Sequence, residues 1–149
     1  MLNKNYKDIL LILSENKVKF MLIGAYAMAA HGFPRSTIDI DLMVMPSPEN
    51  ASLVLTSLES FGAPVHNLSI NDLQKEGLIF QIGVAPCRID ILTSIDGLKF
   101  EDAYSRSIVI EIEGISIHVL SIPDLIVNKR STGRIKDMAD VELLEESLK

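Results

Sequence analysis

The stretch 32-GFPRSTIDIDLMV-44 has the apolar residues of a strand, interrupted by two carboxylates. Side chains alternate between the two faces of a strand, so Asp39 and Asp41 share one face, while Ile40 and Leu42 point to the other. The apolar face predicts burial in a core. Two nearby carboxylates repel one another, and a divalent cation removes that conflict. The alternative interpretation is that this acidic face is simply exposed to water.

A third carboxylate interrupts a second apolar stretch, 87-CRIDIL-92, in the same way. If this strand lies beside the first, Asp90 completes a cluster with Asp39 and Asp41. Hard oxygen ligands suit Mg²⁺ or Mn²⁺, and magnesium sites often combine carboxylates with substrate phosphates. Three carboxylates can hold two metal ions, one activating the attacking oxygen and one stabilising the leaving phosphate.

The segment before the acidic pair predicts a strand that ends at Gly24 and an Ala-rich helix over 25–32. Exposed N–H groups at a helix start favour anions, and a glycine lets a phosphate approach the backbone. A glycine at a strand–helix junction is also a common way to turn the chain, so this signal gains weight only from the acidic pair downstream.

The 149 residues, 48% of them hydrophobic, predict one folded domain over 1–149. The single cysteine, Cys87, excludes an intramolecular disulfide. A net charge of −6 disfavours a general nucleic-acid-binding face, because phosphate neutralisation supplies most of the affinity of such proteins. The apolar run 9–13 is too short to cross a membrane, so we expect no membrane association and a cytoplasmic location.

Periodicity and turn residues predict an α+β fold, a mixed sheet with flanking helices and two C-terminal helices. Helices are expected over 5–16, 25–32, 47–62, 121–130 and 133–148, and strands over 18–24, 37–45, 78–84 and 87–95. A β-hairpin is expected over 107–120, with its turn at Glu113-Gly114. The last helix is expected to carry an apolar stripe formed by Ile135, Met138, Val141, Leu144 and Leu148.

The segment 23–44 resembles the nucleotidyltransferase fold of the polymerase-beta superfamily, and most of all the small bacterial branch that includes the AbiEii-type abortive-infection toxins. The matching features are a strand followed by a turn, an Ala-rich helix ending in His-Gly, and an Arg-x-Thr-x-Asp-x-Asp motif. In this chain they are Gly24-Ala25, His31-Gly32, Arg35, Thr37, Asp39 and Asp41. Asp90 matches the third carboxylate of the family, and 122–144 resembles the C-terminal helices of the branch.

The resemblance implies a Mg²⁺- or Mn²⁺-dependent enzyme that transfers a nucleoside monophosphate from a nucleoside triphosphate to an acceptor hydroxyl. Asp39 and Asp41 would hold the metals on the triphosphate, and Asp90 would help to activate the acceptor oxygen. The Gly24-Ala25 turn would cradle the phosphates, although Ala25 lacks the hydroxyl of a serine that active relatives often have. The acceptor, whether tRNA, protein or small molecule, is not specified, and a cognate antitoxin protein is an implied partner.

The clearest basic cluster comprises Lys129, Arg130, Arg134 and Lys136. Lys129 and Arg134 could neutralise triphosphate charge or contact the acceptor. Alternatively, the four residues are solvated charges at helix ends, with Arg134 or Lys136 paired with Asp137 or Asp140.

Three further residues have two interpretations each. Arg35 either reaches a phosphate or pairs with Asp39. Arg88 either partners Asp90 or contacts substrate. His31 is either a general base or a helix-end residue bonded to backbone.

Three functions remain open on this basis. The first is a metal-dependent nucleotidyltransferase, as a toxin or phage-defence component. The second is a nucleotidyltransferase-fold binding module that has lost catalysis and acts through a protein partner, which Ala25 favours. The third is a metal-dependent phosphohydrolase that uses the same three carboxylates.

Overall fold

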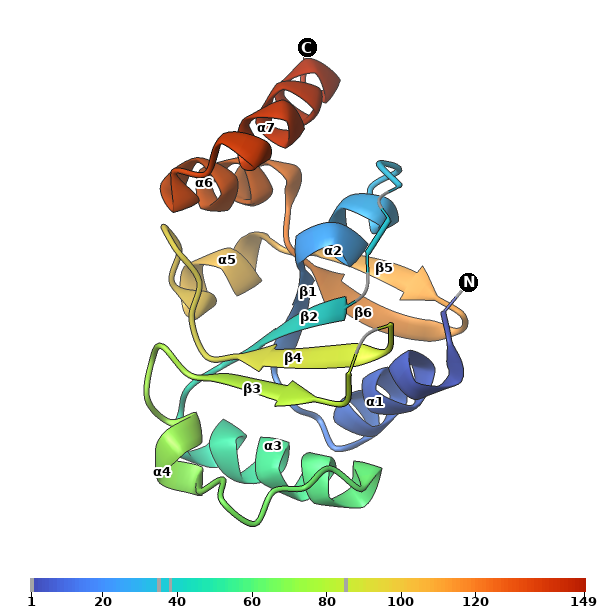
Figure 1. The fold of residues 1–149 in the computed structure, drawn as a ribbon, viewed down its shortest axis with the longest axis vertical. Coiled ribbons are helices and arrows are strands. Elements are labelled where there is room, and N and C mark those ends of the chain that lie inside the picture. The colour runs from blue at the N-terminus through green and yellow to red at the C-terminus, as the bar shows by residue number, and fades with distance from the viewer. Residues whose placement is uncertain (1, 35, 38, 85) are drawn as a thin grey trace.

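The computed structural model describes residues 2–34, 36–37, 39–84 and 86–149, and over these ranges helices flank a mixed sheet of six strands (Figure 1). The strands are β1 (Phe20–Ile23), β2 (Asp39–Val44), β3 (Ile79–Ile82), β4 (Arg88–Leu92), β5 (Ile108–Ile112) and β6 (Ile115–Val119). The helices are α1 (Lys4–Glu15), α2 (Gly24–Ala30), α3 (Pro48–Phe61), α4 (Ile70–Leu73), α5 (Phe100–Arg106), α6 (Ile122–Thr132) and α7 (Ile135–Ser147). This architecture confirms the predicted α+β class and the two C-terminal helices.

The strand order is β3-β4-β2-β1-β6-β5, which places β1 and β2 at the centre and leaves β3 and β5 at the edges. β2 pairs antiparallel with β1 and parallel with β4. β1 also pairs parallel with β6, and the hairpin β5–β6 turns at the predicted Glu113-Gly114. The two acidic strands of the sequence are therefore direct neighbours in the middle of the sheet.

Local signals account for the ends of the helices. The Ser47 side chain accepts a hydrogen bond from the backbone N–H of Asn50 at the start of α3, and Pro48 occupies the first turn. Gly62, with a φ of +93°, ends the same helix in the left-handed conformation that glycine adopts without strain. The predicted boundaries of α3 are confirmed to within a residue.

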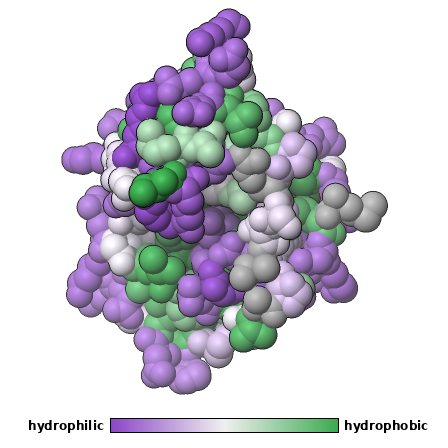
Figure 2. Space-filling view, turned by 45° about the horizontal axis from the view of Figure 1, so that its top comes forward, coloured by the Kyte–Doolittle hydropathy of each residue, from purple (hydrophilic) through white to green (hydrophobic). Residues whose placement is uncertain are grey.

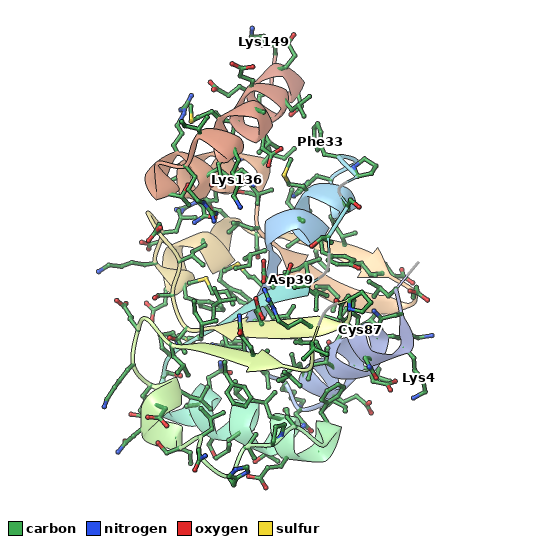
Figure 3. All side chains as sticks on the ribbon, viewed as in Figure 1. Lys4, Phe33, Asp39, Cys87, Lys136 and Lys149 are labelled. Atoms are coloured by element: carbon green, nitrogen blue, oxygen red, sulfur yellow. The ribbon has the colours of Figure 1, made fainter. Side chains whose placement is uncertain are left out.

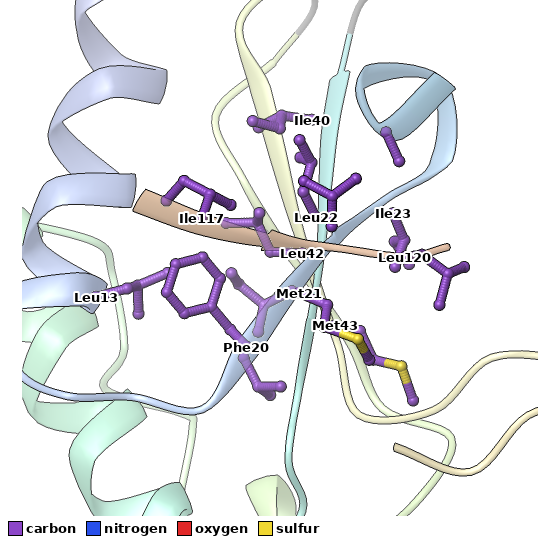
Figure 4. Packing of buried hydrophobic residues seen from close by; sticks show 14 of the residues in the cluster. Leu13, Phe20, Met21, Leu22, Ile23, Ile40, Leu42, Met43, Ile117 and Leu120 are labelled. Carbon is purple, nitrogen blue, oxygen red and sulfur yellow. The ribbon is translucent and has the colours of Figure 1, made fainter. Parts of the chain in front are cut away.

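The core lies on both faces of the central strands. All four residues of β1 are buried, so helices and loops cover both of its faces. Met21 is paired in register with Met43, and their side chains lie close together in Figure 4. On the other face Leu13 of α1 lies beside Phe20. The four apolar residues that recur at helical spacing in α1, namely Tyr6, Ile9, Leu10 and Leu13, are all buried.

Two features differ from the expectations drawn from the sequence. The helix α5 was not predicted, because its two turns are too short for a clear apolar period. Only two of the five residues of the predicted stripe on α7 are buried: Val141 and Leu144 are covered, whereas Ile135 is 90% exposed. α7 packs against α6, so a narrow side of the helix is enough to make the contact.

The exposed apolar residues of α7 belong to a mixed surface. Met138 and Leu148 are exposed together with Ile135. In the space-filling view, apolar side chains are scattered among hydrophilic ones over this face of the molecule (Figure 2). Within the part of the chain that the structure describes, no helix has the length and apolar character needed to cross a membrane.

Leu13 should be one of the residues on which stability depends. Leu13→Ala removes a fully buried side chain and leaves a cavity, so we expect the free energy of unfolding to fall by about 2–5 kcal/mol. Leu11→Ala on the same helix is the control, since Leu11 is 40% exposed and should cost less than about 1 kcal/mol. Urea denaturation followed by circular dichroism measures both, and equal losses would contradict the assigned core.

Candidate active site

Three carboxylates converge on one face of the sheet. β2 and β4 pair in parallel so that Asp41 lies opposite Asp90 and Asp39 lies opposite Arg88. One oxygen from each of Asp39, Asp41 and Asp90 lies within 4.8 Å of the other two. Ile40 and Leu42, the alternate residues of β2, are completely buried on the opposite face. Figure 3 shows Asp39 near the centre of the sheet, below α2 in that view.

Arg88 links two of the three carboxylates. Its Nη2 donates to Asp39 Oδ2 and, at 3.1 Å, to Asp90 Oδ2, while its Nε donates to Asp90 Oδ1 at 3.0 Å. The sequence left open whether Arg88 partners Asp90, and the structure shows that it partners both carboxylates. Thr37 Oγ1 also donates to Asp39, at 3.0 Å to Oδ1. Asp39 and Asp90 are therefore held in position by hydrogen bonds.

Asp41 is the carboxyl of the cluster whose pKa is raised. Burial, followed by the negative charges of Asp39 and Asp90, raises the pKa of Asp41 to about 7, and the positive charge of Arg88 offsets only part of this effect. A carboxyl with a pKa of about 7 is only partly ionised near neutral pH. A divalent cation would favour its ionised form, because opposite charge lowers the pKa of a carboxyl group.

The turn before α2 touches this cluster directly. Ile23 at the end of β1 is paired with Asp41, and Gly24 follows with a φ of +68°. A Cβ atom added at Gly24 would lie 2.6 Å from Asp41 Oδ2, closer than such atoms approach in real structures. The glycine is thus required twice, by its backbone conformation and by the adjacent carboxylate. Ala25 follows within α2 and contributes no hydroxyl.

A cavity of about 450 Å³ opens beside Asp41, between the sheet and the C-terminal helices. Its walls include both Gly24 and Asp41 and the predicted cations Lys129 and Arg134. Apolar side chains of the sheet edge and the following loop also line it, namely Ile79, Leu92 and Ile95. The cavity therefore brings four of the predicted site residues together, although 105 positions separate Gly24 from Lys129 in the sequence.

The cations of α6 and the following turn are paired with the acids of α7. Lys129 Nζ lies 3.0 Å from Asp140 Oδ2 and 3.7 Å from Asp137 Oδ1, and its side chain is only 13% exposed. Arg134 Nε lies 2.8 Å from Asp137 Oδ2, with 58% of its side chain exposed. The predicted pairing is confirmed for Arg134 with Asp137, whereas the contacts of the largely buried Lys129 with Asp137 and Asp140 were not predicted. Each nevertheless keeps a place on the cavity wall.

The remaining predicted residues are accounted for as follows. His31 caps α2, and its Nε2 lies 2.8 Å from the carbonyl oxygen of Leu120, which confirms the helix-end interpretation. Arg35 lies outside the residues that the structure describes, so its predicted role stays a prediction. Cys87 is half-buried, with the Asn3 side-chain amide 3.7 Å from its sulfur, so it is less covered than a core residue.

Tyr6 of α1 also supports the site, although the sequence alone indicates only that it lies on the apolar side of a helix. Its hydroxyl donates to the carbonyl oxygen of Arg88 at 3.1 Å and lies 3.4 Å from that of Pro86. Burial is the main reason that its pKa is raised to about 12. A buried tyrosine hydroxyl needs such a partner, so the interior position of Tyr6 in α1 was the one available signal. The bond anchors the backbone of the strand that carries Arg88 and Asp90.

The donor set fits a hard divalent cation. Three carboxylates on neighbouring strands offer oxygen ligands only, which is the chemistry that Mg²⁺ and Mn²⁺ prefer. Burial, and then the charges of Asp39 and Asp90, raise the pKa of Asp41 even with Arg88 present. The residues that could hold such an ion are therefore Asp39, Asp41 and Asp90, with the cavity next to Asp41 for its other ligands.

Comparisons with known proteins agree with this geometry. A family model described as "Nucleotidyltransferase of unknown function (DUF6036)" matches residues 2–147. A protein from Thermotoga maritima (TM1012), named as a nucleotidyltransferase, is 19% identical, with a TM-score of 0.60 over 99% of this chain and 95% of that one. No curated protein matches the chain.

The antibiotic-resistance factor ANT(2'')-Ia is also similar, at 18% identity. One of its structures has a TM-score of 0.64 over 97% of this chain and 83% of that one. A second, in complex with adenylyl-2''-tobramycin, has a TM-score of 0.62 over 97% and 87%. Identities this low show a shared fold.

The contact between Gly24 and Asp41 gives a test with a close control. Gly24→Ala should destabilise the folded state in two ways, through the backbone strain of a positive φ and through displacement of the Asp41 carboxylate. Gly133 has nearly the same φ, +69°, and no atom lies within 4 Å of a carbon added there. Gly133→Ala should therefore lower the free energy of unfolding through backbone strain alone, by about 1 kcal/mol. We expect Gly24→Ala to cost at least about 1 kcal/mol more in chemical denaturation. Equal costs would contradict the described contact.

The raised pKa of Asp41 predicts a pH dependence of stability in the presence of EDTA. Because the pKa rises from 3.8 to about 7 on folding, the folded state holds a proton that the unfolded state has lost. The free energy of unfolding should therefore fall as the pH rises from about 4 to about 7. Asp41→Asn should flatten this slope and be more stable than wild type at pH 7.5, by at least about 1 kcal/mol.

Asp8→Asn is the control for this measurement, since Asp8 pairs with Lys4 on the surface of α1. It should retain the wild-type slope in denaturation curves recorded at each pH. A wild-type slope in Asp41→Asn would show that another group is responsible.

Proposed function

The chain belongs to the nucleotidyltransferase family described as DUF6036, and on this premise we propose that it transfers a nucleoside monophosphate from a nucleoside triphosphate to an acceptor hydroxyl in a Mg²⁺-dependent reaction. The observation that carries the proposal is the convergence of Asp39, Asp41 and Asp90 beside a cavity that also contains Gly24. A lone acidic strand would not support it, because exposed carboxylates are common on protein surfaces.

The proposed roles follow from position. Asp39, Asp41 and Asp90 hold the cation, and the triphosphate enters the adjoining cavity along Gly24. The bare backbone of Gly24 allows a phosphate to come close, and Ala25 can offer only its backbone N–H there. Arg134, more than half exposed on the cavity wall, is placed to neutralise triphosphate charge. Lys129 can do so only by giving up its contacts with Asp137 and Asp140.

In the proposed reaction the acceptor oxygen forms a bond to the α-phosphorus, the bond from that phosphorus to the bridging oxygen breaks, and pyrophosphate leaves. Asp90, fixed on β4 beside Asp41 of β2, takes the proton of the acceptor hydroxyl. A bound divalent cation would supply charge neutralisation for the attacking and leaving oxygens. The carboxylates contribute orientation, because their backbone positions are set by paired strands.

The identity of the acceptor and the biological role are finer proposals. One structural relative holds an adenylylated small molecule, which favours a small-molecule acceptor over tRNA or protein as the first to test. Membership of the AbiEii-type branch and a cognate antitoxin protein rest on sequence resemblance alone and stay predictions. A neighbouring gene for a small DNA-binding protein would support them.

A second candidate is a binding module that has lost catalysis. Two observations favour it: Ala25 lacks a hydroxyl, and Lys129 is already neutralised by α7. Calorimetry with Mg²⁺ and ATP separates the two functions at the first step. Metal-dependent nucleotide binding supports the enzyme, whereas a protein that binds neither ligand supports the module.

Label transfer tests the enzyme directly. The protein is incubated with α-³²P-labelled nucleoside triphosphates, Mg²⁺ and cell extract divided into RNA, protein and small-molecule fractions. We expect transfer to one fraction, abolished by EDTA. Asp41→Asn should reduce it at least about 100-fold, since loss of metal-assisted charge stabilisation costs several kcal/mol.

Asp8→Asn again serves as the control, because it also removes one carboxylate but lies on the surface of α1. Undiminished transfer by a folded Asp41→Asn variant would contradict the proposed mechanism. Release of free nucleotide or phosphate without any labelled acceptor would instead favour the phosphohydrolase.

A further inference from the structure

Arg88 binds two of the three carboxylates that would hold a cation. Its guanidinium spans the gap between β2 and β4, with hydrogen bonds to Asp39 Oδ2 and to both oxygens of Asp90. Asp39 and Asp90 are also two of the three residues whose oxygens lie within 4.8 Å of one another. An ion held by this cluster would need lone pairs that the guanidinium now uses, and it would be repelled by the positive charge.

We propose that Arg88 is an internal counter-cation, a positioning residue that holds Asp39 and Asp90 together in the metal-free chain and releases them when a divalent cation binds. The inference rests on the proposed function in one respect, namely that these carboxylates bind a cation. It adds that the metal-free site is closed by this side chain, so that bare metal binds more weakly than three free carboxylates would allow.

The surroundings of Arg88 allow the side chain to move while the strand stays in place. Tyr6 holds the carbonyl oxygen of Arg88 at 3.1 Å, and β4 is paired on both edges, with β2 and with β3. The Arg88 side chain is 29% exposed, whereas that of Asp90 is 9% exposed. The exchange of cations therefore requires only rotation of a long, partly exposed side chain. The two carboxylates stay on their paired strands.

The chain contains a matched ion pair away from this site. Arg106 of α5 holds the buried Asp124 of α6 with the same two-pronged geometry, Nε to Oδ2 at 3.0 Å and Nη2 to Oδ1 at 3.2 Å. This pair links two helices. Its removal should destabilise the fold without any effect on metal affinity, which makes it the control for a purely structural arginine.

The test is titration calorimetry with Mn²⁺ alone, without nucleotide, on wild type, Arg88→Met and Arg106→Met. We expect Arg88→Met to bind Mn²⁺ at least about tenfold more tightly than wild type, because one repelling charge is gone and two carboxylates are free. Arg106→Met should bind as wild type does. Equal or weaker binding by Arg88→Met would overturn the inference.

Thermal unfolding provides a second readout. In EDTA, both arginine variants should melt below wild type, since each leaves a buried carboxylate without its partner. Saturating Mn²⁺ should raise the melting temperature of Arg88→Met by more than that of wild type, and should leave the deficit of Arg106→Met unchanged. An Mn²⁺-induced rise no larger in Arg88→Met than in wild type would overturn the inference.

Arg88→Lys keeps the test decisive if the methionine variant does not fold. Lysine retains the charge but lacks the planar fork that reaches two carboxylates at once, so binding should tighten by a smaller factor. Affinity equal to or below that of wild type would again overturn the inference.

Failure of the one premise taken from the proposed function, that these carboxylates bind a cation, gives a different result. Neither wild type nor Arg88→Met would then bind Mn²⁺, and both ideas would be lost. Mn²⁺ binding at equal strength in the two proteins would remove only the role of Arg88. Binding by Arg88→Met but not by wild type would be the strongest support for it.

Discussion

The pairing of β2 with β4 determines where every charge of the candidate site lies. The two strands run parallel, and a shift of one residue in their register would send the carboxylates of one strand to the opposite face of the sheet. Ile40 and Ile89 are paired and buried on that face, so such a shift would expose them. The apolar burial that stabilises the sheet is therefore also what forces like charges together.

The repulsion among the three carboxylates is reduced by a neighbouring cation and by partial protonation. Arg88 offsets the charge of two carboxylates. Burial and the remaining repulsion raise the pKa of Asp41, so that this carboxyl is only partly ionised near neutral pH. The same principle applies across the cavity, where Lys129 is held by the acids of α7. The acidic cluster beside the cavity and the cations on its opposite wall thus both contain ion pairs that a charged ligand could exchange. Stability that is given up locally at such positions is common where binding or catalysis takes place.

The central elements and the acidic face could be predicted from the sequence, because periodicity reports which residues share a face. The helix α5 could not, since two turns carry too little pattern, and the exposure of Ile135 depends on how α7 meets α6. The contact of Arg88 with Asp39 joins residues 49 positions apart and depends on strand order, which no local signal specifies. What the sequence could show was that the carboxylates were available. The distances between the carboxylates, and the position of the Arg88 guanidinium beside them, can be known only from the fold.

The close approach of Gly24 to Asp41 has an evolutionary consequence. A side chain at position 24 has room only if position 41 becomes smaller or its side chain turns away. Positions 24 and 41 are therefore expected to evolve together. While Asp41 remains, selection against substitutions at position 24 is steric as well as functional. If a descendant of this chain lost its chemistry, a change at Asp41 would remove the steric part of this constraint, while the positive φ at position 24 would still favour glycine.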